Sequence, residues 1–272
     1  MLSVLEGDRV VENTERLATV ITGSPNGYFA ALNRLQRQLP IKIGNADGPQ
    51  LRFDLDDAAV EFITRGITED ELPPTQVRTL SHEAAAEAAD YHQRAMELLA
   101  TVHPTLPLSV RRLVGTVLFA DVANCAGGSS GDALGLVWIS PLRGWSAVRY
   151  AECLCHETTH QALFLEDMLT PVFSSDSEQP LVVSSIRGTK RPYESAFHAA
   201  VVAAVVVQMY TALDMPALAA GFVDGLAKSV AEFQITPQHL TARGRELLAE
   251  LAGVVTTVAD IRTGHADSVR SP

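Results

Sequence analysis

The residues best suited to chemistry are two histidines and a glutamate in CLCHETTHQALF, residues 153–164. His156, Glu157 and His160 have the spacing H-E-x-x-H. In a helix, residues four apart lie on one face, so both imidazoles can bind the same metal ion. Glu157 follows about 100° around the helix and could accept a proton from metal-bound water, its role in metalloproteases. The spacing predicts a metal site, with Glu157 as the candidate catalytic residue.

Two histidines do not complete a metal site, so a third ligand must come from another segment. The extended metalloprotease motif requires glycine and histidine where this chain has Leu163 and Glu166, which excludes that class. KRPYESAFH offers Glu194 and His198, one helical turn apart. His198 is favoured because it lies deeper in an apolar helix, where a polar side chain needs a partner. Glu194 is the alternative third ligand, and a hydrogen-bonded core histidine is the competing interpretation of His198.

The stretch LCHETTHQALFLEDM, followed by SSIRGTKRPYESAFHAAVV, resembles the HExxH-motif proteins that modify ribosomally made peptides in natural-product pathways. In that family a variable loop leads to an Arg-Pro step and then to a helix with a histidine. Here these features correspond to Arg191-Pro192 and His198, and the resemblance covers residues 153–209. It implies an iron(II)- and 2-oxoglutarate-dependent oxygenase that hydroxylates Cβ of a peptide residue or of a free amino acid.

An oxygenase of this kind needs a site for its co-substrate as well as for the metal. Iron(II) held by three protein ligands keeps positions open for 2-oxoglutarate and O₂. The far carboxylate of 2-oxoglutarate suits a bidentate arginine. Arg187, Lys190 and Arg191 cluster before the His198 helix, with Arg191 favoured by the family pattern and Arg187 next. An ordinary solvated loop is the competing interpretation of this cluster.

Two other classes of function stay open. A zinc-dependent peptidase or amide hydrolase would use Glu157 to activate metal-bound water. A non-catalytic, metal-stabilised protein would only bind a peptide. The oxygenase is preferred because of the Arg-Pro step and His198, since H-E-x-x-H alone would favour the zinc hydrolase. In the oxygenase, Glu157 need not be a general base and could instead support or replace a metal ligand.

Bulk properties exclude several classes of protein. The 272 residues carry a net charge of -11, which disfavours binding to the phosphates of nucleic acid. Three cysteines do not form a disulfide framework, and the N-terminus lacks a signal-peptide pattern, so a cytoplasmic location is expected. The longest apolar run, residues 199–207, is too short to span a bilayer. The sequence does not determine the oligomeric state.

The elements that must position these residues are mainly helices. Apolar periodicity and capping residues predict helices over residues 10–23, 24–40, 55–66, 75–102, 146–169, 192–214, 216–233 and 237–258. Two β-branched runs, residues 113–121 and 135–140, predict a hairpin or neighbouring strands around the Gly-rich stretch NCAGGSSGD. That stretch lacks the Gly-Lys-Ser/Thr ending of a phosphate-binding loop.

We therefore predict a mainly α fold with a small β hairpin or sheet element and a metal site between two helices. Residues 1–104 form an N-terminal helical region and residues 105–262 a metal-binding catalytic region, together one compact domain. Residues 263–272 are predicted to be a disordered tail. The other histidines, His82, His92, His103, His239 and His265, are predicted to lie on the surface.

Overall fold

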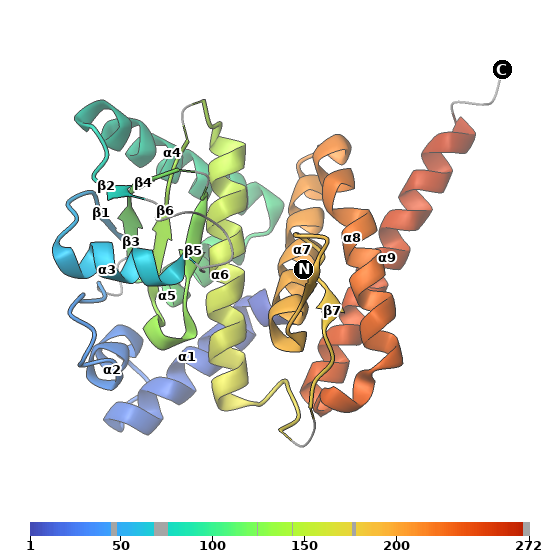
Figure 1. Ribbon diagram of the computed structural model, residues 1–272, viewed down its shortest axis with the longest axis horizontal. Coiled ribbons are helices and arrows are strands. Elements are labelled where there is room, and N and C mark those ends of the chain that lie inside the picture. Colours follow the sequence, from blue (N-terminus) through green and yellow to red (C-terminus); the bar gives the residue numbers. More distant parts are fainter. Residues whose placement is uncertain (45–47, 68–75, 124, 143, 176–177, 269–272) are drawn as a thin grey trace. The chain divides into compact units, whose positions relative to one another are not determined.

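The computed structural model describes the chain except residues 45–47, 68–75, 124, 143, 176–177 and 269–272, and except the side chains of residues 259–268. The chain is mainly helical with small sheets, as predicted (Figure 1). It divides into two compact units. The sheet unit is Val4–Leu169, and the helical unit is Thr170–Pro272 together with Met1–Ser3.

The sheet unit combines six helices with a four-stranded sheet and a small two-stranded one among its described residues. Its elements are α1 (Gly7–Thr22), α2 (Tyr28–Leu35), β1 (Gln50–Arg52), α3 (Asp57–Gly66), β2 (Val77–Arg78), α4 (His82–Val102), α5 (Leu106–Leu113), β3 (Thr116–Phe119), β4 (Asp121–Val122), β5 (Gly127–Ser129), the short 3-10 helix η2 (Gly131–Ala133), β6 (Leu136–Ile139) and α6 (Ala147–Leu169). Residues 3–5 form a further 3-10 turn, η1.

The main sheet has the strand order β1-β3-β6-β5. β1 and β6 both pair with β3 in parallel, and β5 pairs with β6 antiparallel. The two predicted β runs are therefore neighbouring strands rather than a hairpin. The Gly-rich stretch between them supplies β5, which lies at the edge of the sheet. Because β1 pairs with β3, the boundary predicted after residue 104 falls inside one compact unit, and the units part after Leu169.

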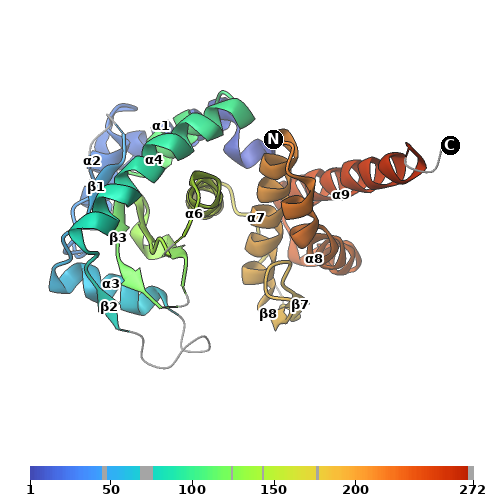
Figure 2. The ribbon, with the colours of Figure 1, turned by 90° about the horizontal axis from the view of Figure 1, so that it is seen from above.

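Side-chain alternation places helices on both faces of this sheet. Leu118 and Trp138 face α3 and form a buried cluster with Ala59 and Ile63. On the opposite face the ring of Phe119 stacks on Tyr150 of α6, with centroids 6.2 Å apart. Figure 2 shows the sheet between α3 and α6. α6 also packs against α1, α4 and α5, so the motif helix is held from several sides.

Local capping explains where the predicted helix boundaries were wrong. α4 begins at His82 because the Ser81 hydroxyl accepts a hydrogen bond from the Ala84 amide, whereas the helix was predicted from residue 75, in a part not described. α2 begins after Gly27, which has a positive φ of 102°, and not at residue 24, where the helix was predicted to begin. Residue 113, predicted as strand, ends α5.

The helical unit contains α7 (Tyr193–Ala212), α8 (Pro216–Ile235), the 3-10 helix η3 (Pro237–His239) and α9 (Ala242–Ser268). α7 packs on α8 and α9, and β7 (Val182–Val183) pairs antiparallel with β8 (Lys190–Arg191) against α8. Close approach of this hairpin requires Gly225, where a Cβ would lie 2.2 Å from the Ser185 carbonyl oxygen. α9 continues through residues 263–268, which were predicted to be disordered.

α7 is apolar along most of its length. By length and composition it is the one described helix that could cross a bilayer, but 78% of its apolar window is buried, as in the core helix of a soluble protein. The helix was predicted from residue 192, and Pro192 is its N-cap. Its fixed φ and missing amide suit it to this position.

Candidate functional site

The motif helix α6 begins and ends close to its predicted limits. The Ser146 hydroxyl accepts a hydrogen bond from the Arg149 amide, which caps the first turn. The hydroxyls of Thr158 and Thr159 bond back to the carbonyls of Leu154 and Cys155, so these two polar side chains are satisfied within the helix. Their burial therefore leaves the helix intact around the motif.

His156 and His160 lie side by side on α6, as the spacing predicted. Their ring centroids are 5.0 Å apart, and the His160 ring stacks on Phe164 at 6.0 Å. Burial lowers the pKa of His160 to about 4, and burial with the charges of His160 and Arg149 lowers the pKa of His156 well below its usual value. Both imidazoles are therefore neutral at neutral pH, which is the form that binds metals.

Glu157 is a buried carboxylate beside this pair. Its Oε1 lies 4.0 Å from His156 Nε2, and its Oε2 accepts a hydrogen bond of 2.7 Å from the Ser129 hydroxyl of β5. Burial raises the pKa of Glu157 to about 7, against the opposing effect of the Ser129 bond. A carboxyl group with this pKa exchanges protons readily near neutral pH, which suits a general base.

Glu152 is a buried carboxylate one turn before His156 on α6. It forms an ion pair with Arg149, one turn earlier in the same helix. Arg149 in turn lies over the Trp145 ring, 5.6 Å from its centroid. This pair places a second carboxylate and its counter-ion in the turn that precedes the motif.

The predicted third ligand lies in the other unit. His198 is 9% exposed on α7, and its ring stacks on Phe173 with centroids 6.1 Å apart. Glu194, one turn earlier, is exposed. Within the described part of the chain, no group of three or more His, Cys, Asp or Glu side chains is gathered to hold a metal. The assignment of His198, or of Glu194, as third ligand stays a prediction.

The basic residues predicted for 2-oxoglutarate belong to β8 and to the turn before it. Burial and the positive charge of Arg191 both lower the pKa of Arg187, so these two guanidinium groups are close enough to repel each other. Lys190 is exposed and pairs across the hairpin with Val183. Arg187 and Arg191 thus form a local concentration of positive charge in an acidic chain.

The chain has no match among protein-family models or among curated proteins. The family resemblance and its residues therefore stay predictions from the sequence.

Sequence reasoning missed several polar residues that hold the motif helix. Glu166, fully buried on α6, accepts two hydrogen bonds from Arg9 and one from Asn13. Ser129 was assigned only to a strand connection. It is the one polar side chain of the Gly-Gly-Ser run 127–129, and this is the signal that could have indicated a role. Nothing in the sequence around Glu166 indicates its partner Arg9, which lies on α1, 157 residues earlier in the chain.

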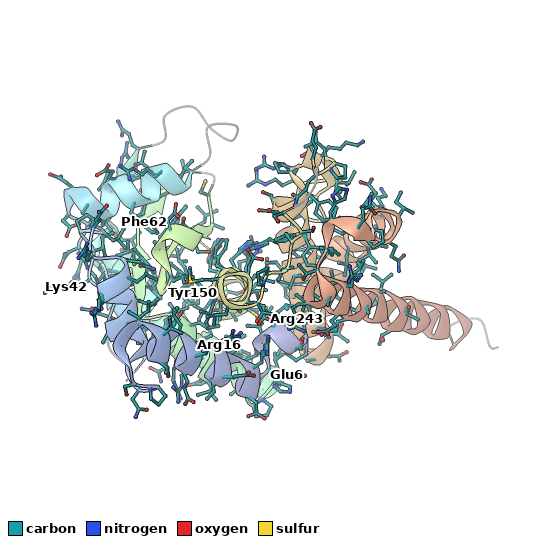
Figure 3. The ribbon with its side chains drawn as sticks, turned by 90° about the horizontal axis from the view of Figure 1, so that it is seen from below. Glu6, Arg16, Lys42, Phe62, Tyr150 and Arg243 are labelled. Carbon is teal, nitrogen blue, oxygen red and sulfur yellow. The ribbon has the colours of Figure 1, made fainter. Side chains whose placement is uncertain are left out.

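Of the histidines predicted to lie on the surface, His239 is buried, His92 and His103 are partly buried, and the side chain of His265 lies outside the described part. His239 is 6% exposed and packs against the Tyr193 ring. The Nδ1 of His92 lies 3.1 Å from the hydroxyl of Tyr150, which is on α6 between that helix and the sheet (Figure 3). His82 is exposed, as predicted.

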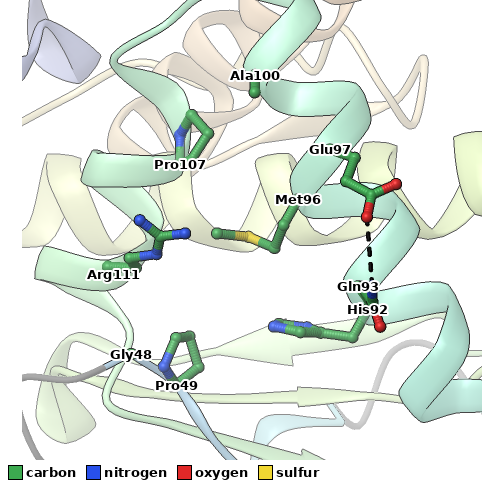
Figure 4. A pocket seen from close by; sticks show the side chains of 9 residues that line it. All are labelled: Gly48, Pro49, His92, Gln93, Met96, Glu97, Ala100, Pro107 and Arg111. Atoms are coloured by element: carbon green, nitrogen blue, oxygen red, sulfur yellow. Dashed lines mark hydrogen bonds between the residues drawn. The ribbon is translucent and has the colours of Figure 1, made fainter.

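His92 also lines a surface hollow of about 610 Å³ between α4 and α5. Figure 4 shows Arg111, Met96 and His92 around this hollow; its other lining residues are Gly48, Pro49, Gln93, Glu97, Ala100 and Pro107. It contains none of the predicted metal or co-substrate residues. Its connection to the motif helix is the contact between His92 and Tyr150.

Proposed function

We propose that this chain is an iron(II)- and 2-oxoglutarate-dependent oxygenase that hydroxylates Cβ of a residue in a ribosomally made peptide, or of a free amino acid. The observation that carries the proposal is the pair of neutral imidazoles, His156 and His160, beside the carboxylate of Glu157. The choice of iron and 2-oxoglutarate rests on the resemblance through Arg191-Pro192 and His198.

In this proposal His156, His160 and His198 hold the metal, and Glu194 is the alternative to His198. Three ligands suffice for iron(II) sites of this class, which leave room for a co-substrate. When bound, the iron and 2-oxoglutarate supply the oxidative chemistry, and the protein binds, orients and excludes water. Ser129 fixes one oxygen of Glu157, which keeps the other directed toward His156.

Arg191 and Arg187 are the groups proposed to bind the far carboxylate of 2-oxoglutarate. Burial, and next the charge of Arg191, lower the pKa of Arg187, and an anion placed between the two guanidinium groups would offset both effects. Lys190 is the third candidate, but an ammonium group lacks the planar, bidentate geometry that matches a carboxylate.

A zinc-dependent amide hydrolase is the second candidate function. It is favoured by one observation, the pKa of about 7 that burial gives Glu157 at 4.0 Å from His156 Nε2. A carboxylate so placed can take a proton from a water molecule beside the histidine pair. The reaction would be hydrolysis of a peptide or other amide bond, with no requirement for O₂.

The two functions are separated by metal content and co-substrate consumption. The chain is purified without air, and its bound metals are measured by mass spectrometry. Succinate formed from 2-oxoglutarate is then measured with iron(II) and air, in the presence of a mixture of the free amino acids. Oxygen-dependent succinate formation that is lost in His160→Ala and kept in His82→Ala supports the oxygenase, because His82 is an exposed histidine far along the chain from the motif.

Other outcomes contradict the oxygenase. Cleavage of a casein digest with zinc, in the absence of O₂ and 2-oxoglutarate, would establish the hydrolase instead. Stoichiometric metal binding through His156 and His160 with neither succinate nor cleavage would favour the non-catalytic, metal-stabilised peptide-binding protein.

A further inference from the structure

Among the described residues β5 is an edge strand of the main sheet, and part of its backbone faces away from that sheet. The amide of Ser140 donates to the carbonyl of Ala126, which makes these two residues a hydrogen-bonded pair of the antiparallel ladder. Such pairs alternate along a ladder, so Gly128 bonds to Trp138 while Gly127 and Ser129 do not bond to β6. The N–H and C=O groups of Gly127 and Ser129 therefore point away from the sheet, and no described strand lies on that side.

Small side chains keep this edge open. Residues 127–129 read Gly-Gly-Ser and are half-buried. At Gly127 a Cβ would lie 2.8 Å from the Trp138 carbonyl and 3.0 Å from the Cys153 sulfur, and at Gly128 it would lie 2.6 Å from the Trp138 indole nitrogen. Glycine is required here by close packing on both faces. The consequence is an edge strand with almost no side chains to block a neighbouring chain.

Residues 126–131, which include β5, run along the motif helix from one turn before the histidines to one turn after them. Ala126 accepts a hydrogen bond from the Cys153 sulfur at 3.5 Å, and Ser129 bonds to Glu157. A Cβ at Gly131 would lie 3.2 Å from the Phe164 ring, which stacks on His160. The free edge of the strand therefore passes alongside the histidine pair.

The order of residues around α6 sets where the histidines point. Gln161 bonds to Gly135 and Leu136, at the start of β6, and Glu157 bonds to β5. At about 100° per residue, Glu157 lies about 40° around the helix axis from Gln161. Continuing in the same direction, His160 comes next and His156 after it. The helix thus presents successive faces to β6, to β5, and to the space beyond the edge of β5, where the two histidines lie.

From these relationships we infer that β5 binds an extended peptide by strand addition, so that the peptide lies across the faces of His156 and His160. The partner with matching chemistry is another backbone in extended conformation, because it alone offers donors and acceptors at the spacing of Gly127 and Ser129. The inference rests on the proposed function only in treating this peptide as the substrate.

Strand addition would also determine which side chains of the peptide meet the site. Successive side chains of a strand point to opposite faces of a sheet. Those on the same face as the Ser129 side chain point toward α6, and every second residue of the peptide would do so. A substrate bound this way presents one residue at a time to the histidine pair. The backbone bonds are common to all peptides, and the side chains that face α6 determine which peptides bind best.

The test compares two substitutions at one position. Ser129→Pro removes the outward N–H and keeps the bonds to β6, because an edge strand tolerates proline where the amide points outward. Ser129→Ala is the matched control, since it removes the same hydroxyl and keeps the amide. The probe is a pool of random dodecapeptides displayed on phage, selected on the purified full chain, from which an enriched peptide is synthesised.

We expect Ser129→Ala to bind this peptide within about threefold of the unchanged chain and Ser129→Pro to bind it at least about fivefold more weakly, in line with loss of one hydrogen bond. Amide exchange followed by NMR should slow at Gly127 and Ser129 when the peptide is added to the unchanged chain. If Ser129→Pro does not fold, this exchange measurement decides the matter without it.

Three results would overturn the inference: no peptide enriched above a selection without protein, equal affinity in both variants, or unchanged exchange at both amides. The binding assay contains neither iron nor 2-oxoglutarate. Peptide binding at β5 without succinate formation would therefore contradict the oxygenase and leave strand addition in place. Succinate formation without peptide binding at β5 would contradict strand addition and leave the oxygenase in place.

Discussion

The Oγ of Ser129 donates a hydrogen bond to Oε2 of Glu157 across 2.7 Å, which joins the edge strand β5 to the helix that carries both motif histidines. Glu157 is buried, and its carboxylate would otherwise lose hydration without a replacement. This bond therefore couples the position of the strand to that of the carboxylate beside His156.

Removing the hydroxyl should lower the stability of the sheet unit. We expect Ser129→Ala to reduce the free energy of unfolding by about 1–2 kcal/mol, the range for a hydrogen bond to a charged or partly charged group. Both tryptophans, Trp138 and Trp145, belong to the sheet unit, so their fluorescence during urea unfolding reports on this unit. A double-mutant cycle with Glu157→Gln isolates the interaction, and a coupling energy near zero would contradict it.

The sequence predicted the helices of this site better than the strands. α6 could be located because Ser146 caps it and apolar residues repeat along it, and both signals are local. The parallel pairing of β3 with β6 could not be predicted, because the Gly-rich stretch between the two runs was compatible with a hairpin as well as with neighbouring strands. Residues 127–129 of that stretch form β5 on the far side of β6. Pairing between distant strands depends on tertiary packing that no local pattern encodes.

The polar contacts of the site were also beyond local reasoning. The spacing of His156 and His160 gave their common face correctly, since i and i+4 are fixed by the helix itself. Ser129 contacts Glu157, 28 residues later in the chain, and Arg9 contacts Glu166, 157 residues later. Such contacts follow from how elements pack, and a single sequence does not indicate them.

The ion pair between Arg9 and Glu166 should be important for stability because its carboxylate is fully buried. Glu166 is 0% exposed and accepts hydrogen bonds of 2.5 and 3.1 Å from Arg9. Arg9→Met would leave this charge without its cation, and we expect a loss of about 3 kcal/mol or more in urea unfolding. Arg94→Met is the control, because Arg94 and Asp90 form an exposed pair, and it should cost less than about 1 kcal/mol. Equal losses in the two variants would refute this.

His92 should make the sheet unit less stable in acid. Burial lowers its pKa from 6.5 to about 4, so between these values the unfolded chain binds a proton that the native chain does not. The stability of the native state is therefore unaffected by His92 above pH 6.5 and decreases as the pH falls toward 4, because the unfolded chain is stabilised by the bound proton. His92→Gln cannot titrate, and its unfolding free energy should fall less steeply over this range, by about 3 kcal/mol in total. Parallel pH profiles in tryptophan-monitored urea unfolding would contradict the assignment.

Metal affinity should distinguish the two proposed third ligands. If His198 completes the site, His198→Ala should weaken zinc or iron(II) binding at least about 100-fold, while Glu194→Ala should change it little, because two imidazoles alone bind weakly. Competition with a chromogenic chelator measures both affinities. His198 is nearly buried, so circular dichroism of the metal-free variants must first match that of the unchanged chain. The reverse order of effects would assign the ligand to Glu194.

Two glycines in α8 should respond in opposite directions to the same substitution. At Gly225 a Cβ would lie 2.2 Å from the Ser185 carbonyl oxygen, which must move, so Gly225→Ala should destabilise the helical unit by about 2 kcal/mol. At Gly221, one turn earlier, a Cβ meets nothing within 4 Å among the described residues, and alanine should stabilise the helix by about 0.5–1 kcal/mol. Thermal unfolding followed by circular dichroism at 222 nm measures both. Because the two sites share a helix and a substitution, a common direction of change would show that helix propensity, and not the approach of the β7–β8 hairpin, controls this segment.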